Sequence, residues 1–143
     1  MIRIGTPADT PRIIACDPRA GDESDHGVFV LDAIVTKRCL VAELDGAIVG
    51  YAVWDDHFFG NRFLELLFVV ERARRRGIGA ALVRAFEETT QAPKVFTSTN
   101  ESNAPMRALL GGLGWVGCGW IDHLDPGDPE LIYVRLRSAA SAE

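Results

Sequence analysis

The fold is decided by the stretch Glu71-Arg72-Ala73-Arg74-Arg75-Arg76-Gly77-Ile78-Gly79-Ala80, which joins two segments of different periodicity. Before it, residues 63–70 form a nearly continuous apolar run that is typical of a strand covered on both faces. After it, apolar residues recur at helical spacing and predict an amphipathic helix: Ile78, Ala81, Leu82, Ala85 and Phe86. The sequence therefore predicts a strand, a basic glycine-containing turn and a helix in direct succession.

A basic turn at the start of a helix is suited to binding a diphosphate. The first turn of a helix exposes unpaired backbone N–H groups and carries partial positive charge. Gly77 and Gly79 have no side chain to keep an anion from these N–H groups, and the neighbouring arginines add charge-assisted contacts. The alternative is a solvated arginine run at a strand–helix junction, which leaves the two spaced glycines unexplained.

Two other phosphate-binding motifs do not match this turn. A dinucleotide-binding turn requires Gly-x-Gly-x-x-Gly, but the third glycine position is Leu82. It also requires an acidic residue about 20 positions later, where the sequence has Val95-Phe96-Thr97-Ser98. A P-loop requires Gly-Lys-Ser or Gly-Lys-Thr, and neither occurs. A nucleotide-binding redox domain is therefore disfavoured.

The rest of the chain alternates predicted strands and helices. The predicted strands cover residues 2–4, 40–44, 47–54, 94–99, 115–121 and 131–136, and Asp45-Gly46 predicts a hairpin turn between two of them. Further helices are predicted over residues 11–16, 28–37 and 103–110, although the β-branched residues of 28–37 leave a strand as the alternative there. The last helix is capped by Ser102 or Asn103 and ended early by Gly111-Gly112. Loops are expected over 17–27, 55–61 and 122–129. We expect one domain over residues 1–137 and a flexible tail over 138–143.

The pattern Arg74-x-x-Gly77-x-Gly79 resembles the acyl-CoA pyrophosphate loop of the GNAT acetyltransferase superfamily. The opening Ile2-Arg3-Ile4 and the segment from Asn103-x-x-Met106 to Leu113-Gly114-Trp115 are similar to that family's first strand and later Asn-x-x-Ala helix. The resemblance covers essentially the whole chain. It implies an α/β (α+β) fold with a mixed, mostly antiparallel central sheet of about seven strands and about four flanking helices.

The same resemblance implies a set of cofactor contacts. In the family, backbone amides of the loop hold the pyrophosphate of acetyl-CoA, which here would mean Arg74, Arg75, Arg76, Gly77, Ile78, Gly79 and Ala80. The backbone of Phe68 and Val69 would bond the pantetheine arm and help polarise the thioester carbonyl. Asn103 would contact pantetheine as well; a plain helix cap is the alternative, and both roles can hold together.

Acetyl transfer to an amine requires a base, because an alkylammonium has a pKa near 10. Glu65 is the leading candidate, since it is the only charged residue within 63–70 and a carboxylate there is costly unless paired or functional. Burial would raise its pKa toward the range useful for a base. The run Leu64-Glu65-Leu66-Leu67-Phe68-Val69 is similar to a strand of polyamine-type members whose matching Glu has a catalytic or substrate-binding role. The alternative is that Glu65 faces a wet groove or pairs with Arg62.

One position departs from the family pattern. Many members place a Tyr seven residues after the Asn, where its hydroxyl protonates the departing thiolate, but here that position is Leu110. Water, Tyr133, Tyr51 or Cys118 is left to supply the proton, or turnover is slow.

The sequence thus predicts an acetyl-CoA-dependent N-acetyltransferase that modifies a primary amine of a small molecule by direct attack in a ternary complex. An acyl-CoA-binding module with little or no catalysis is the alternative. With 20 Asp+Glu against 15 Lys+Arg and a formal charge of −5, we expect neither nucleic acid nor a membrane as partner. The three cysteines have no ligand spacing, which predicts reduced thiols in a cytoplasmic protein and no metal. A homodimer is left open.

Overall fold

The computed structural model describes residues 1–138. Of the tail predicted over residues 138–143, all but Ser138 lies outside the described residues. Seven strands are hydrogen-bonded in the order β1-β2-β3-β4-β5-β7-β6, and with the helices they form the predicted mixed, mostly antiparallel α/β fold. The chain divides into two compact units: Met1–Trp54 with Leu66–Thr89, and Asp55–Glu65 with the residues from Thr90 onward. The single domain predicted over residues 1–137 stays a prediction.

The strands are β1 (Ile2–Ile4), β2 (Cys39–Leu44), β3 (Ala47–Phe58), β4 (Asn61–Val69), β5 (Lys94–Asn100), β6 (Val116–Ile121) and β7 (Glu130–Leu136). The α-helices are α1 (Thr10–Cys16), α2 (Asp25–Val35), α3 (Ile78–Glu87) and α4 (Ala104–Gly112), and the short 3-10 turns are η1 (Pro7–Asp9), η2 (Pro18–Gly21) and η3 (Glu71–Ala73). The β4–β5 pair is parallel, whereas β1–β2, β2–β3, β5–β7 and β6–β7 are antiparallel. None of the described helices is long and apolar enough to cross a membrane.

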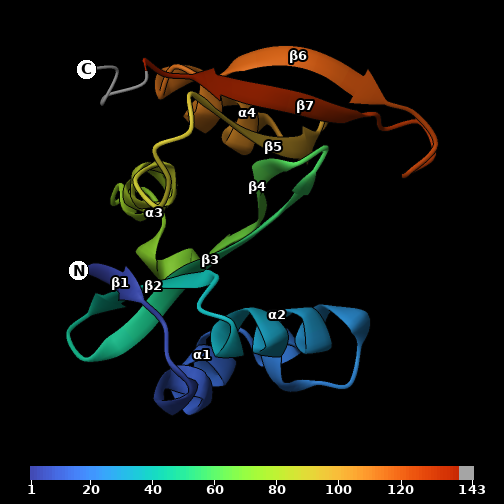
Figure 1. Cartoon of the computed structure of the whole chain (residues 1–143). Coiled ribbons are helices and arrows are strands. Elements are labelled where there is room, and N and C mark those ends of the chain that lie inside the picture. The colour runs from blue at the N-terminus through green and yellow to red at the C-terminus, as the bar shows by residue number, and fades with distance from the viewer. Residues whose placement is uncertain (139–143) are drawn as a thin grey trace. The chain divides into compact units, whose positions relative to one another are not determined.

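In the first unit, helices lie on both faces of β1, β2 and β3. Figure 1 shows α1 and α2 on one face and α3 on the other. The core on the α1 and α2 side consists of side chains with almost no exposure, among them Ile13, Val30, Ile34, Val41 and Tyr51. The predicted hairpin between β2 and β3 is confirmed, because Asp45 and Gly46 have φ values of 52° and 80°.

Two predicted loop boundaries are wrong. Helix α2 begins at Asp25, earlier than predicted, because the Ser24 side chain caps it by accepting from the Gly27 N–H. The loop predicted over residues 55–61 is a second tight hairpin, in which β3 continues to Phe58 and β4 begins at Asn61. Phe59 and Gly60 form its turn with φ values of 50° and 78°.

The predicted early end of the helix at Gly111-Gly112 is also wrong. Helix α4 runs through Gly112, and Gly114 then adopts a φ of 91°. The Trp115 N–H returns to the Leu110 carbonyl at 3.0 Å. Leu110 and Leu113 are buried, so the packing of this helix outweighs the low helical propensity of the two glycines.

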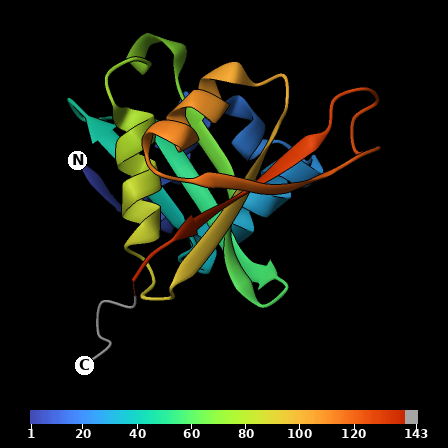
Figure 2. The same cartoon turned by 90° about the horizontal axis from the view of Figure 1, so that it is seen from above.

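The second unit is built on β7, which pairs with β5 on one side and β6 on the other. Figure 2 shows β6 and β7 in orange to red, joined by the loop of residues 122–129. That loop is hydrogen-bonded to the end of β5 and the residues after it, since Asn100 Nδ2 donates to Asp125 Oδ2 at 2.8 Å and Ser102 Oγ to Asp128 Oδ2 at 2.6 Å.

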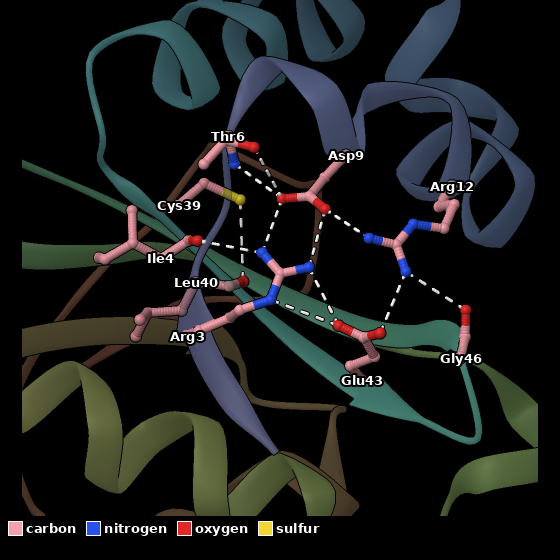
Figure 3. A network of polar contacts seen from close by, with 9 residues as sticks. All are labelled: Arg3, Ile4, Thr6, Asp9, Arg12, Cys39, Leu40, Glu43 and Gly46. Atoms are coloured by element: carbon pink, nitrogen blue, oxygen red, sulfur yellow. Dashed lines mark hydrogen bonds and ion pairs between the residues drawn. The ribbon is translucent and has the colours of Figure 1, made fainter.

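An ion-pair network joins β1, α1 and β2 in the first unit (Figure 3). Asp9 is only 2% exposed and accepts from Arg3 at 2.8 Å through each carboxylate oxygen and from Arg12 at 2.7 Å. Glu43 accepts from the same two arginines, at 3.0 Å and 3.1 Å. The hydrogen bonds from Arg3 hold the pKa of the Asp9 carboxyl well below its usual range.

Replacing Asp9 with Asn is expected to lower the free energy of unfolding at neutral pH by about 2 kcal/mol, because the neutral amide cannot form the charge-assisted hydrogen bonds of the buried carboxylate. The folded pKa of Asp9 lies below the unfolded value of about 3.9, so this contribution is present above about pH 4 and is lost as the pH falls. Urea unfolding at about pH 7 and about pH 3 measures it. The difference in unfolding free energy between the wild type and Asp9→Asn should be smaller at the lower pH. An equal difference at both pH values would contradict the stabilising role assigned to the ionised Asp9 carboxylate.

Candidate functional site

The predicted phosphate-binding turn lies in the first unit, between the end of β4 and the start of α3. It follows the short turn η3, and Gly77 is the residue directly before α3. Arg75 and Gly77 both have left-handed backbone, with φ values of 66° and 77°. A Cβ added to Gly77 would meet no atom within 4 Å, so the backbone conformation rather than packing favours glycine there.

The backbone N–H groups of residues 75–80 form a run of unused donors. Within the described part of the chain, none of them donates a hydrogen bond, and the next N–H, that of Ala81, donates to the Gly77 carbonyl at 2.9 Å. The left-handed residues and the start of α3 place these donors at the positive end of a helix of 10 residues. Arg72, Arg75 and Arg76 are exposed around them. This arrangement can bind a diphosphate through backbone donors and nearby guanidinium groups.

Arg74 differs from the neighbouring arginines in the direction of its side chain. Its Nε donates to the carbonyl of Val69 at 3.1 Å, so the side chain folds back onto the end of β4. Arg74 therefore links the loop to the strand segment that is predicted to contact pantetheine. The resemblance assigns the backbone amide of Arg74 to the pyrophosphate, but that N–H donates to the Glu71 carbonyl at 3.1 Å and so is not one of the unused donors.

The end of β4, with Phe68 and Val69, lies unusually close to β3 at Gly50. A Cβ on Gly50 would be 2.8 Å from the Phe68 carbonyl oxygen and 3.3 Å from Val69 Cγ2. The Val70 N–H then donates to the Val49 carbonyl at 2.9 Å. Gly50 therefore fixes the position of these peptide groups. Sequence reasoning missed this role, although a glycine inside an apolar strand is a recognised signal of close backbone approach.

Glu65 lies in the second unit, and the burial expected for it is wrong. The residue is exposed on β4. Pairing of β4 with β5 ends one residue earlier, at Phe63 with Phe96 and Leu64 with Thr97. The position on β4 therefore agrees with the alternative in which Glu65 faces solvent. Its neighbour Arg62 bonds Asp56 at 2.7 Å.

Asn103, directly before α4, and Leu110, on α4, also lie in the second unit. The capping role of Asn103 is confirmed, because its Oδ1 accepts from the Met106 N–H at 3.2 Å. The residue is exposed, and its contact with pantetheine stays a prediction. Leu110 is fully buried, so the helical position expected to hold a proton donor belongs to the apolar core.

Tyr51 is excluded as a substitute proton donor for the thiolate. It is fully buried, and its hydroxyl donates to Asp17 Oδ2 at 2.5 Å. Burial also raises the pKa of Tyr51 above its usual value. Tyr133, half-buried on β7, and Cys118, exposed on β6, stay candidates. All three cysteines are free, and no group of three His, Cys, Asp or Glu among residues 1–138 could hold a metal ion.

The sequence matches a family model over residues 10–134, and that family is the acetyltransferase (GNAT) family. The structure is similar to an acetyltransferase of the GNAT family from Bacillus cereus ATCC 10987, at 29% identity and a TM-score of 0.86, over 96% of this chain and 97% of that chain. No curated protein sequence matches.

Two structures of lower identity share the fold. One is ribosomal-protein-alanine N-acetyltransferase from Brucella melitensis, at 23% identity and a TM-score of 0.74, over 95% of this chain and 99% of that one. The other is diaminobutyrate acetyltransferase EctA from Paenibacillus lautus, at 19% identity and a TM-score of 0.71, over 94% of this chain and 93% of that one. The second was solved with its substrate L-2,4-diaminobutyric acid and coenzyme A.

Proposed function

Because this chain belongs to the GNAT acetyltransferase family, we propose that it is an acetyl-CoA-dependent N-acetyltransferase acting on a primary amine of a small molecule. The observation that carries the proposal is the run of unused N–H donors at residues 75–80, at the start of α3 and beside exposed arginines. A diphosphate is the chemical group that such donors fit, and acetyl-CoA carries one. The three free cysteines support a cytoplasmic location.

We assign the parts of acetyl-CoA to residues as follows. The N–H groups of residues 75–80 bind the pyrophosphate, and Arg75 and Arg76 add positive charge. The backbone of Phe68 and Val69 bonds the pantetheine arm and polarises the thioester carbonyl. Asn103 is a further pantetheine contact. Arg74 contributes its backbone to the loop and its side chain to the end of β4.

The reaction is direct attack in a ternary complex. Glu65 accepts a proton from the ammonium group, directly or through one water, which frees the nitrogen lone pair. The nitrogen then attacks the thioester carbon, and the carbon–sulfur bond breaks as the tetrahedral intermediate collapses to the amide. The nitrogen loses its second proton as the amide forms, and water carries that proton to the departing coenzyme A thiolate, because Leu110 has no proton to donate. These reaction steps form no covalent intermediate with the enzyme.

A binding module for acyl-CoA with little or no catalysis is the second candidate. It is favoured by one observation, the fully buried Leu110 at the helical position where a proton donor is expected. Such a module would keep the phosphate-binding loop and lack turnover.

The two candidates are separated by free-thiol release from acetyl-CoA in the presence of a panel of amines. The panel contains small diamines, amino acids, aminoglycoside-like cations and a peptide with an N-terminal alanine. We expect release with at least one small amine and tight acetyl-CoA binding by calorimetry. Binding without release for any amine would favour the binding module, and release with the peptide alone would overturn the small-molecule assignment.

A further inference from the structure

A buried carboxylate in the first unit has no role in the site described so far. Asp17, between α1 and η2, is 2% exposed and accepts a hydrogen bond from the Tyr51 hydroxyl at 2.5 Å. It also accepts from Arg19 through Nε at 3.0 Å, Nη2 at 3.2 Å and the backbone N–H at 3.2 Å. His26 Nε2 lies 3.4 Å from its Oδ2. Asp17 therefore ties the segment after α1 to the middle of β3.

Tyr51 and Arg19, which donate hydrogen bonds to Asp17, both contact the ring of Phe68. The ring centroids of Tyr51 and Phe68 are 5.8 Å apart, and the guanidinium carbon of Arg19 lies 5.6 Å from the Phe68 centroid. Gly50, next to Tyr51 on β3, allows the Phe68 carbonyl to approach closely. Phe68 is thus held at its ring by Tyr51 and Arg19 and at its backbone by Gly50.

We propose that Asp17 is a positioning residue of the acyl-donor site, which fixes the Phe68 peptide group by holding Tyr51 and Arg19 against the Phe68 ring. This inference rests on the proposed function, because that function assigns the backbone of Phe68 and Val69 to the pantetheine arm. Without the carboxylate charge, the hydrogen bond from the Tyr51 hydroxyl is no longer charge-assisted and Arg19 loses its counter-charge, so both residues are held less firmly against the ring. The N–H groups of residues 75–80 take no part in these bonds.

The two halves of the cofactor should therefore respond differently to Asp17→Asn. The probes are acetyl-CoA and 3′-phospho-ADP, which is the nucleotide portion of coenzyme A without pantetheine. By calorimetry we expect the affinity for acetyl-CoA to fall about tenfold, whereas the affinity for 3′-phospho-ADP stays unchanged. In steady-state kinetics, KM for acetyl-CoA should rise while KM for the amine is unchanged. Tyr51→Phe, which keeps the ring and removes only the hydroxyl, should show a smaller loss of the same kind.

Asp9→Asn is the matched control, because Asp9 is also a buried carboxylate between β1 and α1 with two charge-assisted hydrogen-bond partners, Arg3 and Arg12. It should lower stability and leave both affinities unchanged. An unchanged acetyl-CoA affinity in Asp17→Asn, or an equal loss in Asp9→Asn, would overturn the inference. If Asp17→Asn does not fold, an unchanged acetyl-CoA affinity in Tyr51→Phe overturns it. Failure of the wild-type protein to bind either probe would instead overturn the proposed function, and with it this inference.

Discussion

Replacing Gly77 with Asp is expected to abolish useful binding of acetyl-CoA, with a loss of affinity of at least about 100-fold. Asp tolerates left-handed backbone better than most residues, and Gly77 has a φ of 77° with open space around it, so the chain should still fold. The new carboxylate would compete for the N–H groups of residues 75–80 and repel the diphosphate. At a separation of about 4 Å near a protein surface, such a repulsion is worth about 4 kcal/mol. Calorimetric titration with acetyl-CoA measures the loss.

Two variants separate charge from conformation. Gly77→Asn has nearly the same shape and backbone preference but no charge, so its loss of affinity should be much smaller than that of Gly77→Asp. Gly46→Asp places the same residue at a turn glycine of matching geometry, with a φ of 80° and open space, in the β2–β3 hairpin. That variant should bind acetyl-CoA like the wild type. Wild-type affinity in Gly77→Asp would refute the assignment of the diphosphate to this loop.

Replacing Glu65 with Gln is expected to lower kcat by about 100-fold or more while the acetyl-CoA affinity is unchanged, because a general base acts on the amine and not on the donor. The pH dependence of kcat/KM should change as well, since the variant has no carboxylate to titrate. Initial rates over a pH series, with calorimetry for acetyl-CoA, measure both effects.

Glu88→Gln is the control for this change, since Glu88 is an exposed glutamate at the end of α3. It should have wild-type rates. An unchanged rate and an unchanged pH profile in Glu65→Gln would remove Glu65 as the base and leave the proton to water.

The strand, turn and helix around Gly77 could be predicted because each has a local signal: apolar continuity before it, glycine spacing within it and helical periodicity after it. The hairpin at Asp45 and Gly46 was predictable for the same reason. The second hairpin was not, because Phe59 is a non-glycine residue with a φ of 50° and no turn-forming side chain. Such a residue takes this conformation when the two strands on either side pair.

The candidate site was predictable in its loop and less so elsewhere. The motif located the donors of residues 75–80, since they belong to one contiguous segment. The exposure of Glu65 was not predicted, because a residue pattern in one strand does not report what covers each of its faces. The contact of Asp17 with Tyr51 joins residues 34 positions apart, and it requires the packing of α1 against β3. Neither side chain has a local signal for that contact.

Binding of a diphosphate by the N–H groups of residues 75–80 is tested most directly by NMR titration of the wild-type protein with 3′-phospho-ADP. Backbone amide chemical shifts report on these donors themselves rather than on an activity that depends on the whole site. We expect the largest shift changes at the amides of residues 75–80, all saturating with a single Kd. Saturable binding that leaves these amides unshifted, or no binding at all, would contradict the assignment of this loop to the pyrophosphate of acetyl-CoA.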